Sequence, residues 1–177
     1  MAPSLTRWTT LLLAITSAMA VATVYFAQPL LESMAAELGV GQQQIGWVVG
    51  ATQAGYALGL LLIVPLGDLV DRTRLLLGQL LFSALALIGV GMSQSWAMLL
   101  VALAVTGLMA VMVQVMVAHA ASLASPGQQG QAVGAVTSGV VLGILLARLV
   151  SGGLADLAGW RSVYWMAAGV LIVLALV

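Results

Sequence analysis

The charged side chains of this chain are few, and several of them lie close together in the sequence. The 177 residues include five basic side chains, all of them Arg, five acidic side chains and a single His. Within the segment from Gly67 to Arg74, charges fall on Asp68, Asp71, Arg72 and Arg74. An Asp in such a segment can accept hydrogen bonds from backbone N–H groups at the start of a helix, or it can pair with an Arg.

Arg148 is the clearest case of an ionisable residue within an apolar stretch. An ionisable group inside a membrane span is costly and usually faces the interior of a helix bundle or a water-filled cavity. Arg148 is expected about four residues inside the end of its stretch. It is a candidate site for an anionic or polar group of a substrate, or for a gating pair with Glu32. The alternative is that its side chain reaches the lipid headgroups.

Other polar side chains in the apolar stretches are candidates for contact with a substrate. Gln28 and Gln53 are expected at a depth similar to that of Arg148. Tyr25 and Tyr56 offer hydrogen bonds and aromatic surface, although hydrogen bonding between helices is an equally open role for each. Near the end of another stretch, His119 can titrate near neutral pH and carry a proton. Contact with interfacial water is the alternative for this His.

The small set of polar and charged residues also argues against catalysis and against binding of nucleic acid. There is no Cys, which excludes a disulfide framework, a thiolate metal site and a Cys nucleophile. One His and a few scattered acidic residues do not predict a metal cluster, and no arrangement of Ser, His and Asp stands out. The net charge is zero and no basic run occurs. We expect a protein that is not an enzyme and that has no cofactor, no metal and no nucleic-acid partner.

The composition predicts that most of the chain is surrounded by lipid. Hydrophobic residues make up 63% of the chain, charged residues make up only 6%, and the mean hydropathy is +1.18. A soluble domain typically has about a quarter charged residues, which cover its surface. The first apolar run, from Trp8 to Leu31, is longer than the apolar region of a signal peptide, so we expect it to be retained as a helix.

A helix needs roughly 20 residues to cross about 30 Å of hydrocarbon. We therefore expect an all-α membrane protein, a single six-helix bundle over residues 1–177, with spans at about 8–31, 44–66, 75–92, 96–121, 131–152 and 163–177. Arg7, Arg72 and Arg74 fall on one side and Arg161 on the other, which predicts a cytoplasmic N-terminus. The last span stops at Val177 without a polar flank, and from this we expect a sequence truncated at its C-terminus.

The segment between the second and third spans resembles the signature loop of the major facilitator superfamily, commonly written G-x-L-a-D-R-x-G-R. Four positions match in register, namely Gly67, Leu69, Asp71 and Arg72. Arg74 and Leu75 depart from the pattern, since they stand where Gly and Arg are usual. The resemblance implies the N-terminal six-helix half of a twelve-helix transporter. It also implies that Asp71 helps to lock the cytoplasmic ends of the two halves together in the outward-facing state.

The fifth span resembles a glycine-rich motif of exporters in this family, G-x8-G-x3-G-P-x2-G-G. The small positions, which preserve close helix packing, are here Gly134, Gly143, Ala147, Ser151 and Gly152. Arg148 replaces the Pro, which weakens an inference of antiport. The resemblance further implies that helix 4 lines the cavity, which makes Gln114 a candidate substrate contact. Leu103 stands where many proton-coupled exporters have Arg, so proton coupling through that position is not supported.

Together, these observations predict half of a secondary active transporter that exports small amphipathic or drug-like compounds by alternating access. Sparse polarity favours such compounds over sugars. The expected partners are the lipid bilayer, a small-molecule substrate, and either the missing C-terminal half or a second copy. The expected location is the cell membrane, of the bacterial inner-membrane type. The alternatives are a non-transporting fragment and a stand-alone six-helix membrane protein that acts as a homodimeric transporter or a channel.

Overall fold

The computed structural model describes residues 6–125 and 127–177. In chain order, its helices are α1 (Arg7–Tyr25), η1 (Gln28–Leu30), α2 (Leu31–Glu37), η2 (Gln42–Gln44), α3 (Gly46–Leu62), α4 (Leu66–Leu69), α5 (Arg72–Gly91), α6 (Trp96–Ala110), α7 (Met112–Leu123), α8 (Gln129–Ala158) and α9 (Trp160–Leu176). The described part of the chain contains no strand, and the all-α membrane fold is confirmed.

Several helices follow one another closely enough to form single long apolar segments. Three such segments are long and apolar enough to cross a membrane, namely Arg7–Glu37, Gln42–Leu69 and Trp96–Leu123, and so are the single helices α5 (Arg72–Gly91) and α8 (Gln129–Ala158). The sixth apolar helix is α9, with 17 residues. The chain is therefore a multi-pass membrane protein.

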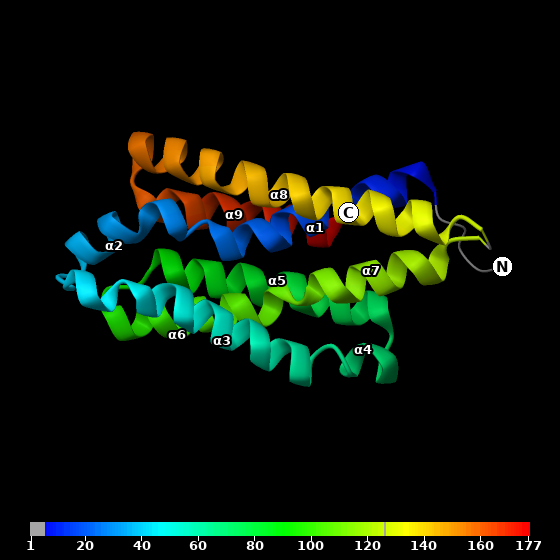
Figure 1. Ribbon diagram of the computed structural model, residues 1–177, viewed down its shortest axis with the longest axis horizontal. Coiled ribbons are helices and arrows are strands. Elements are labelled where there is room, and N and C mark those ends of the chain that lie inside the picture. Colours follow the sequence, from blue (N-terminus) through cyan, green and yellow to red (C-terminus); the bar gives the residue numbers. More distant parts are fainter. Residues whose placement is uncertain (1–5, 126) are drawn as a thin grey trace.

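The bundle is built from three closely packed helix pairs, in which α1 packs on α8, α3 on α6, and α5 on α9. Figure 1 shows α1 and α8 along one side and α3 and α6 along the other. The beginning of α1, the α4 segment and the α7–α8 connection lie at one end of the molecule, which we call the inner end. The arm formed by α2 and the α8–α9 turn lie at the opposite end, which we call the outer end.

Glycines allow two of these pairs to approach at backbone distance. A Cβ atom on Gly55 of α3 would overlap the carbonyl oxygen of Ala104 on α6. In the same way, a Cβ atom on Gly139 or Gly143 of α8 would overlap a carbonyl oxygen of α1. In a bilayer, where lipid tails are as apolar as Leu, such close packing of small residues drives helix association.

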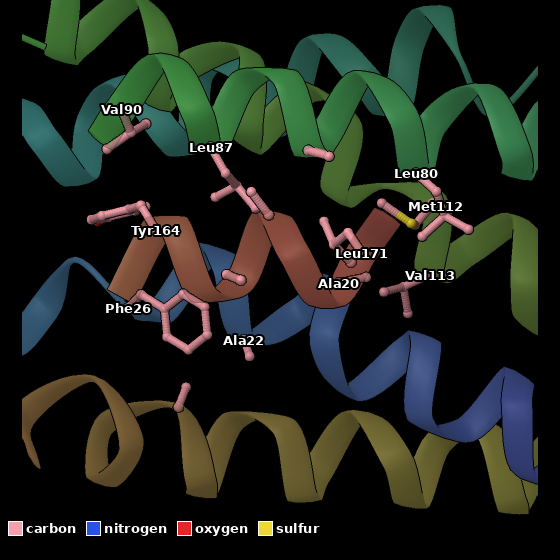
Figure 2. Close-up of a cluster of buried hydrophobic side chains, with 14 of the residues drawn as sticks. Ala20, Ala22, Phe26, Leu80, Leu87, Val90, Met112, Val113, Tyr164 and Leu171 are labelled. Atoms are coloured by element: carbon pink, nitrogen blue, oxygen red, sulfur yellow. The ribbon is translucent and has the colours of Figure 1, made fainter. Parts of the chain in front are cut away.

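The third pair is held by larger side chains. Figure 2 shows Tyr164 and Leu171 of α9 beside Leu87 and Val90 of α5, with α1 on the other side of α9. All four side chains are fully buried. Tyr164 also meets the ring of Trp160 edge to face, with 6.0 Å between the ring centroids. The helix that ends the chain is thus part of the core.

The first apolar segment changes direction before it reaches the outer end. α1 ends at Tyr25, and the chain continues as η1 and α2. Pro29 lies in η1 and has no backbone N–H, so it cannot donate a helical hydrogen bond. As a result, α2 forms a short separate arm that ends at Glu37.

The fifth segment extends further than the sequence predicts. α8 continues to Ala158, past the predicted end at residue 152, and Gly153 and Asp156, which were expected in a connection, are helical. The helix ends at Gly159, whose φ of 80° lies in the left-handed region that favours glycine. Gly159 alone separates α8 from α9, so the turn at the outer end is tight.

Candidate functional site

The signature segment forms a hydrogen-bonded turn between α4 and α5. Asp71 is the N-cap of α5, and its Oδ1 atom accepts a hydrogen bond from the backbone N–H of Arg74 at 2.9 Å. This contact satisfies a backbone donor that would otherwise lack a partner at the start of the helix. The side chain of Arg74 makes no hydrogen bond or ion pair with any residue that the structure describes.

Arg72 ties this turn to the inner end of α7. Its Nη1 atom donates to the carbonyl oxygen of Ala118 at 3.0 Å, and its Nε atom donates to that of Gly67 at 3.3 Å. Its Nη2 atom lies 3.4 Å from Oδ1 of Asp68, which forms an ion pair. We call these four residues the inner clasp. His119 follows Ala118 on α7 and is partly buried.

Two of the predicted substrate contacts meet directly. Nε2 of Gln114, on α7, donates to the phenolic oxygen of Tyr56, on α3, at 3.3 Å. Gln114 is exposed and Tyr56 is partly buried, so the pair lies at the surface of the bundle. Gln53 is also exposed, one turn before Tyr56 on α3. Amide and hydroxyl groups are therefore concentrated on this part of α3 and α7.

Other predicted contacts lie toward the outer end. Gln28 and Glu32 line a groove of about 510 Å³ between the α2 arm and the start of α3, together with Gln42. Tyr25 is partly buried and packs against the hydrophobic core.

Arg148 is exposed on α8, ten residues before the end of that helix at Ala158. The ion pairs among the described residues are Arg72 with Asp68 and Arg161 with Glu37. Arg148 and Glu32 are therefore not brought together in this conformation.

The small residues predicted on the fifth helix fall into two groups. Gly143, Ala147 and Ser151 are buried, and Gly143 is in backbone contact with α1. Gly134 and Gly152 have no atom within 4 Å of where a Cβ atom would stand. The second backbone contact with α1 is made by Gly139, four residues before Gly143, which the motif does not include.

A polar cluster at the outer end was not among the sites predicted from the sequence. Nε1 of Trp160 donates to Oε2 of Glu37 at 2.6 Å, and Arg161 forms an ion pair with the other carboxylate oxygen. Nη2 of Arg161 donates to the carbonyl oxygen of Ser93 at 2.7 Å. The guanidinium also stacks over the Trp160 ring, 4.2 Å from its centroid. We call these four residues the outer clasp.

A signal for the outer clasp was present in the sequence. Glu37 and Arg161 are opposite charges in two connections that the predicted topology places on one side of the bilayer. In a chain with so few charges, such a coincidence favours pairing.

The sequence profile of the major facilitator superfamily matches residues 11–177. The uncharacterized transporter YgaY of Escherichia coli O157:H7 is 46% identical over 165 residues, which cover 93% of this chain and 42% of YgaY. In Streptomyces coelicolor, the protein named Probable transporter SCO4007 is 34% identical over 165 residues, which cover 93% of this chain and 38% of that protein. The chain thus spans less than half the length of these relatives.

Proposed function

Because the chain belongs to the major facilitator superfamily, we propose that it is the N-terminal six-helix half of a secondary transporter. This transporter exports small amphipathic or drug-like compounds by alternating access, in which two six-helix bundles rock around a central site. The second bundle is a C-terminal half or a second copy of this chain. The membrane is the bacterial inner membrane, in keeping with the bacterial relatives.

The observation that carries this proposal is the polar surface on α3 and α7. Tyr56 and Gln114 hydrogen-bond across the two helices, and Gln53 and Gln114 remain exposed. Polar side chains at membrane depth are favourable only where they face protein or a water-filled cavity. A second bundle placed against this surface closes a cavity that has few hydrogen-bonding groups in largely apolar walls. Such a cavity suits amphipathic compounds better than sugars.

Arg148 and His119 have separate roles in this scheme. Arg148 faces the cavity from α8 and binds a polar group of the substrate, because its exposed guanidinium is costly against lipid. His119 lies next to the carbonyl that Arg72 binds, at the inner end, and is the candidate proton carrier.

Efflux of a fluorescent amphiphile from proteoliposomes tests the role of Arg148 in the natural protein that contains this chain. We expect Arg148→Ala to abolish efflux and Arg148→Lys to retain part of it. The matched control is Asp156→Asn, which removes an exposed charge elsewhere on the same helix. Unchanged efflux by the Ala variant at matched membrane levels would refute the assignment. Efflux by this chain alone would show that a second copy is the other bundle.

Orientation is tested separately. Arg7, Arg72 and Arg74 belong to the inner end, so we propose that this end and the N-terminus face the cytoplasm. The chain has no Cys, so a single Cys at position 68 can be labelled without a background signal. An impermeant maleimide added to intact cells should leave it unlabelled. A Cys at position 156, at the outer end, should react. The opposite pattern would reverse the topology.

A further inference from the structure

The outer groove contains a carboxylate that has no partner. The groove is lined by Gln28, Pro29, Leu31, Glu32, Gln42, Ile45 and Gly46. These residues come from η1 and α2 on one side, and from η2 and the start of α3 on the other. Glu32 makes no ion pair and no side-chain hydrogen bond within residues 6–125 and 127–177. Its charge is therefore available to a ligand.

The other acidic side chains show why Glu32 is distinctive. Asp68 pairs with Arg72, Asp71 caps α5, and Glu37 belongs to the outer clasp. Asp156 is unpaired within the described part of the chain, but it lies on α8 and is not part of this groove. Among the acidic residues that the structure describes, Glu32 is the one that presents an unpaired carboxylate to this groove.

The chemistry of the lining selects a protonated amine. A carboxylate forms its strongest hydrogen bonds with cationic donors. The amide oxygens of Gln28 and Gln42 can accept the remaining ammonium protons, while Leu31 and Ile45 offer apolar surface to the hydrocarbon part of the ligand. A divalent metal ion would need about six oxygen ligands and more negative charge. No basic side chain lines the groove, so nothing there neutralises Glu32 or attracts an anion.

The position of Glu32 is fixed from both ends of its short arm. Pro29 interrupts the helix just before α2. At the far end of α2, Glu37 is held by Trp160 and Arg161. Met34 and Ala35 of α2 are buried, so the arm packs on the bundle through one face and presents the exposed Glu32 across from the start of α3.

A line of open glycines connects this groove with the polar surface. Gly46, Gly50 and Gln53 lie at intervals of four and three residues, which places them on one face of α3. Gly46 and Gly50 have open space where a Cβ atom would stand, in contrast to Gly55 on the packed face. This face of α3 is therefore open at both glycines that lie between the groove and Gln53, one turn before Tyr56.

We propose that this groove binds the ammonium group of amphipathic amines through Glu32, with Gln28 and Gln42 as additional acceptors. The inference rests on the proposed transport function, because it names the class of compound that the transporter selects. The groove is then the outer binding site for such compounds, and the open face of α3 connects it with Tyr56 and Gln114.

Equilibrium dialysis against the 177-residue chain in lipid nanodiscs tests this proposal. The probes are radiolabelled 1-naphthylmethylamine, which is cationic at neutral pH, and 1-naphthalenemethanol, which is neutral and of similar size. Empty nanodiscs provide the lipid background. We expect the chain to bind the amine about tenfold more tightly than the alcohol, as one charge-assisted hydrogen bond allows. Equal binding of the two probes would overturn the proposal.

Variants locate the selectivity. Glu32→Gln should abolish the preference for the amine and leave alcohol binding unchanged, whereas Glu32→Asp should keep part of the preference. Asp156→Asn removes the same charge outside the groove and should bind as wild type does. A preference that persists in Glu32→Gln, with wild-type helicity by circular dichroism, would refute the assignment.

Transport measurements separate the two proposals. If Glu32→Gln exports neutral and cationic compounds with the wild-type preference for the cationic ones, the amine site is refuted. The proposed transport function is then unaffected. Binding that depends on Glu32, without transport of any compound by the natural protein, would refute the transport function and leave the site intact.

Discussion

The two clasps use the same chemistry at opposite ends of one helix pair. Arg72 is the first residue of α5 and Arg161 is the second residue of α9, and these two helices pack antiparallel against each other. Each Arg donates to a backbone carbonyl of another element and pairs with one carboxylate. The guanidinium groups are also similarly exposed, at 30% for Arg72 and 29% for Arg161.

The clasps differ in what they connect. The carboxylate partner of Arg72 is Asp68, four residues away and 80% exposed. The partner of Arg161 is Glu37, 124 residues away and 50% exposed, and Trp160 holds the same carboxylate. The outer clasp therefore joins distant parts of the fold, whereas two of the three contacts that Arg72 makes in the inner clasp are local. We infer that the outer clasp stabilises the bundle and that the inner clasp can open at small cost.

Arg161→Ala tests the outer clasp, which we infer to be the more stabilising of the two. The variant loses the hydrogen bonds to Glu37 and Ser93 and the stacking on Trp160, so we expect the free energy of unfolding to fall by about 2 kcal/mol. Unfolding in mixed detergent micelles, followed by circular dichroism, measures the effect. Arg72→Ala is the matched variant and should be less destabilising. Equal losses would remove the distinction between the clasps.

Trp160→Phe isolates one contact within the outer clasp. The substitution removes the N–H that donates to Glu37 and keeps an aromatic face under Arg161, so we expect a loss of about 1 kcal/mol. The same unfolding assay applies. Combining Trp160→Phe with Glu37→Ala should cost less than the sum of the two, because both substitutions remove the same hydrogen bond. Full additivity would show that the two side chains act independently.

Asp68→Asn tests the inner clasp, which we infer to be the less stabilising of the two. Because Asp68 is largely exposed, its pairing with Arg72 should contribute less than about 0.5 kcal/mol to the stability of the chain. The effect should shrink further in high salt, where exposed charges are screened. A loss as large as that of Trp160→Phe would show that the inner clasp is as strong structurally as the outer one.

Asp71→Asn should hardly change the free energy of unfolding, but it should slow the turnover of the transporter. Asn is nearly as good an N-cap as Asp, so α5 keeps its first hydrogen bond. The other carboxylate oxygen of Asp71 has no partner in the part of the chain that the structure describes, and its charge is lost. We expect slower transport by the natural protein with nearly unchanged substrate affinity. A loss of affinity as large as the loss of turnover would contradict a role in the conformational cycle.

The sequence predicted the elements better than it predicted the contacts between them. The apolar stretches and the low charge content are enough to predict an all-α membrane protein, because lipid requires internally satisfied backbone. The end of α8 was misplaced because Gly153 and Asp156 are typical of a loop, whereas the helix stops only at Gly159.

Within the candidate site, contacts between distant residues were harder to predict than the residues themselves. Tyr56 and Gln114 were each selected as polar residues in apolar stretches, but their hydrogen bond depends on how α3 crosses α7. The pairing of Glu37 with Arg161 likewise depends on the bend at Pro29 and the tight turn at Gly159. Such contacts depend on how the helices pack, and helix packing cannot be read directly from a single sequence.

The glycine contacts also determine which parts of the bundle can move. The helices of each glycine-packed pair, α1 with α8 and α3 with α6, meet at backbone distance, so neither can slide without steric conflict at Gly55 or Gly143. Each pair should therefore move as one rigid unit. Bending is then left to the segments beyond these crossings, such as the turn around α4, where the inner clasp can open at small cost.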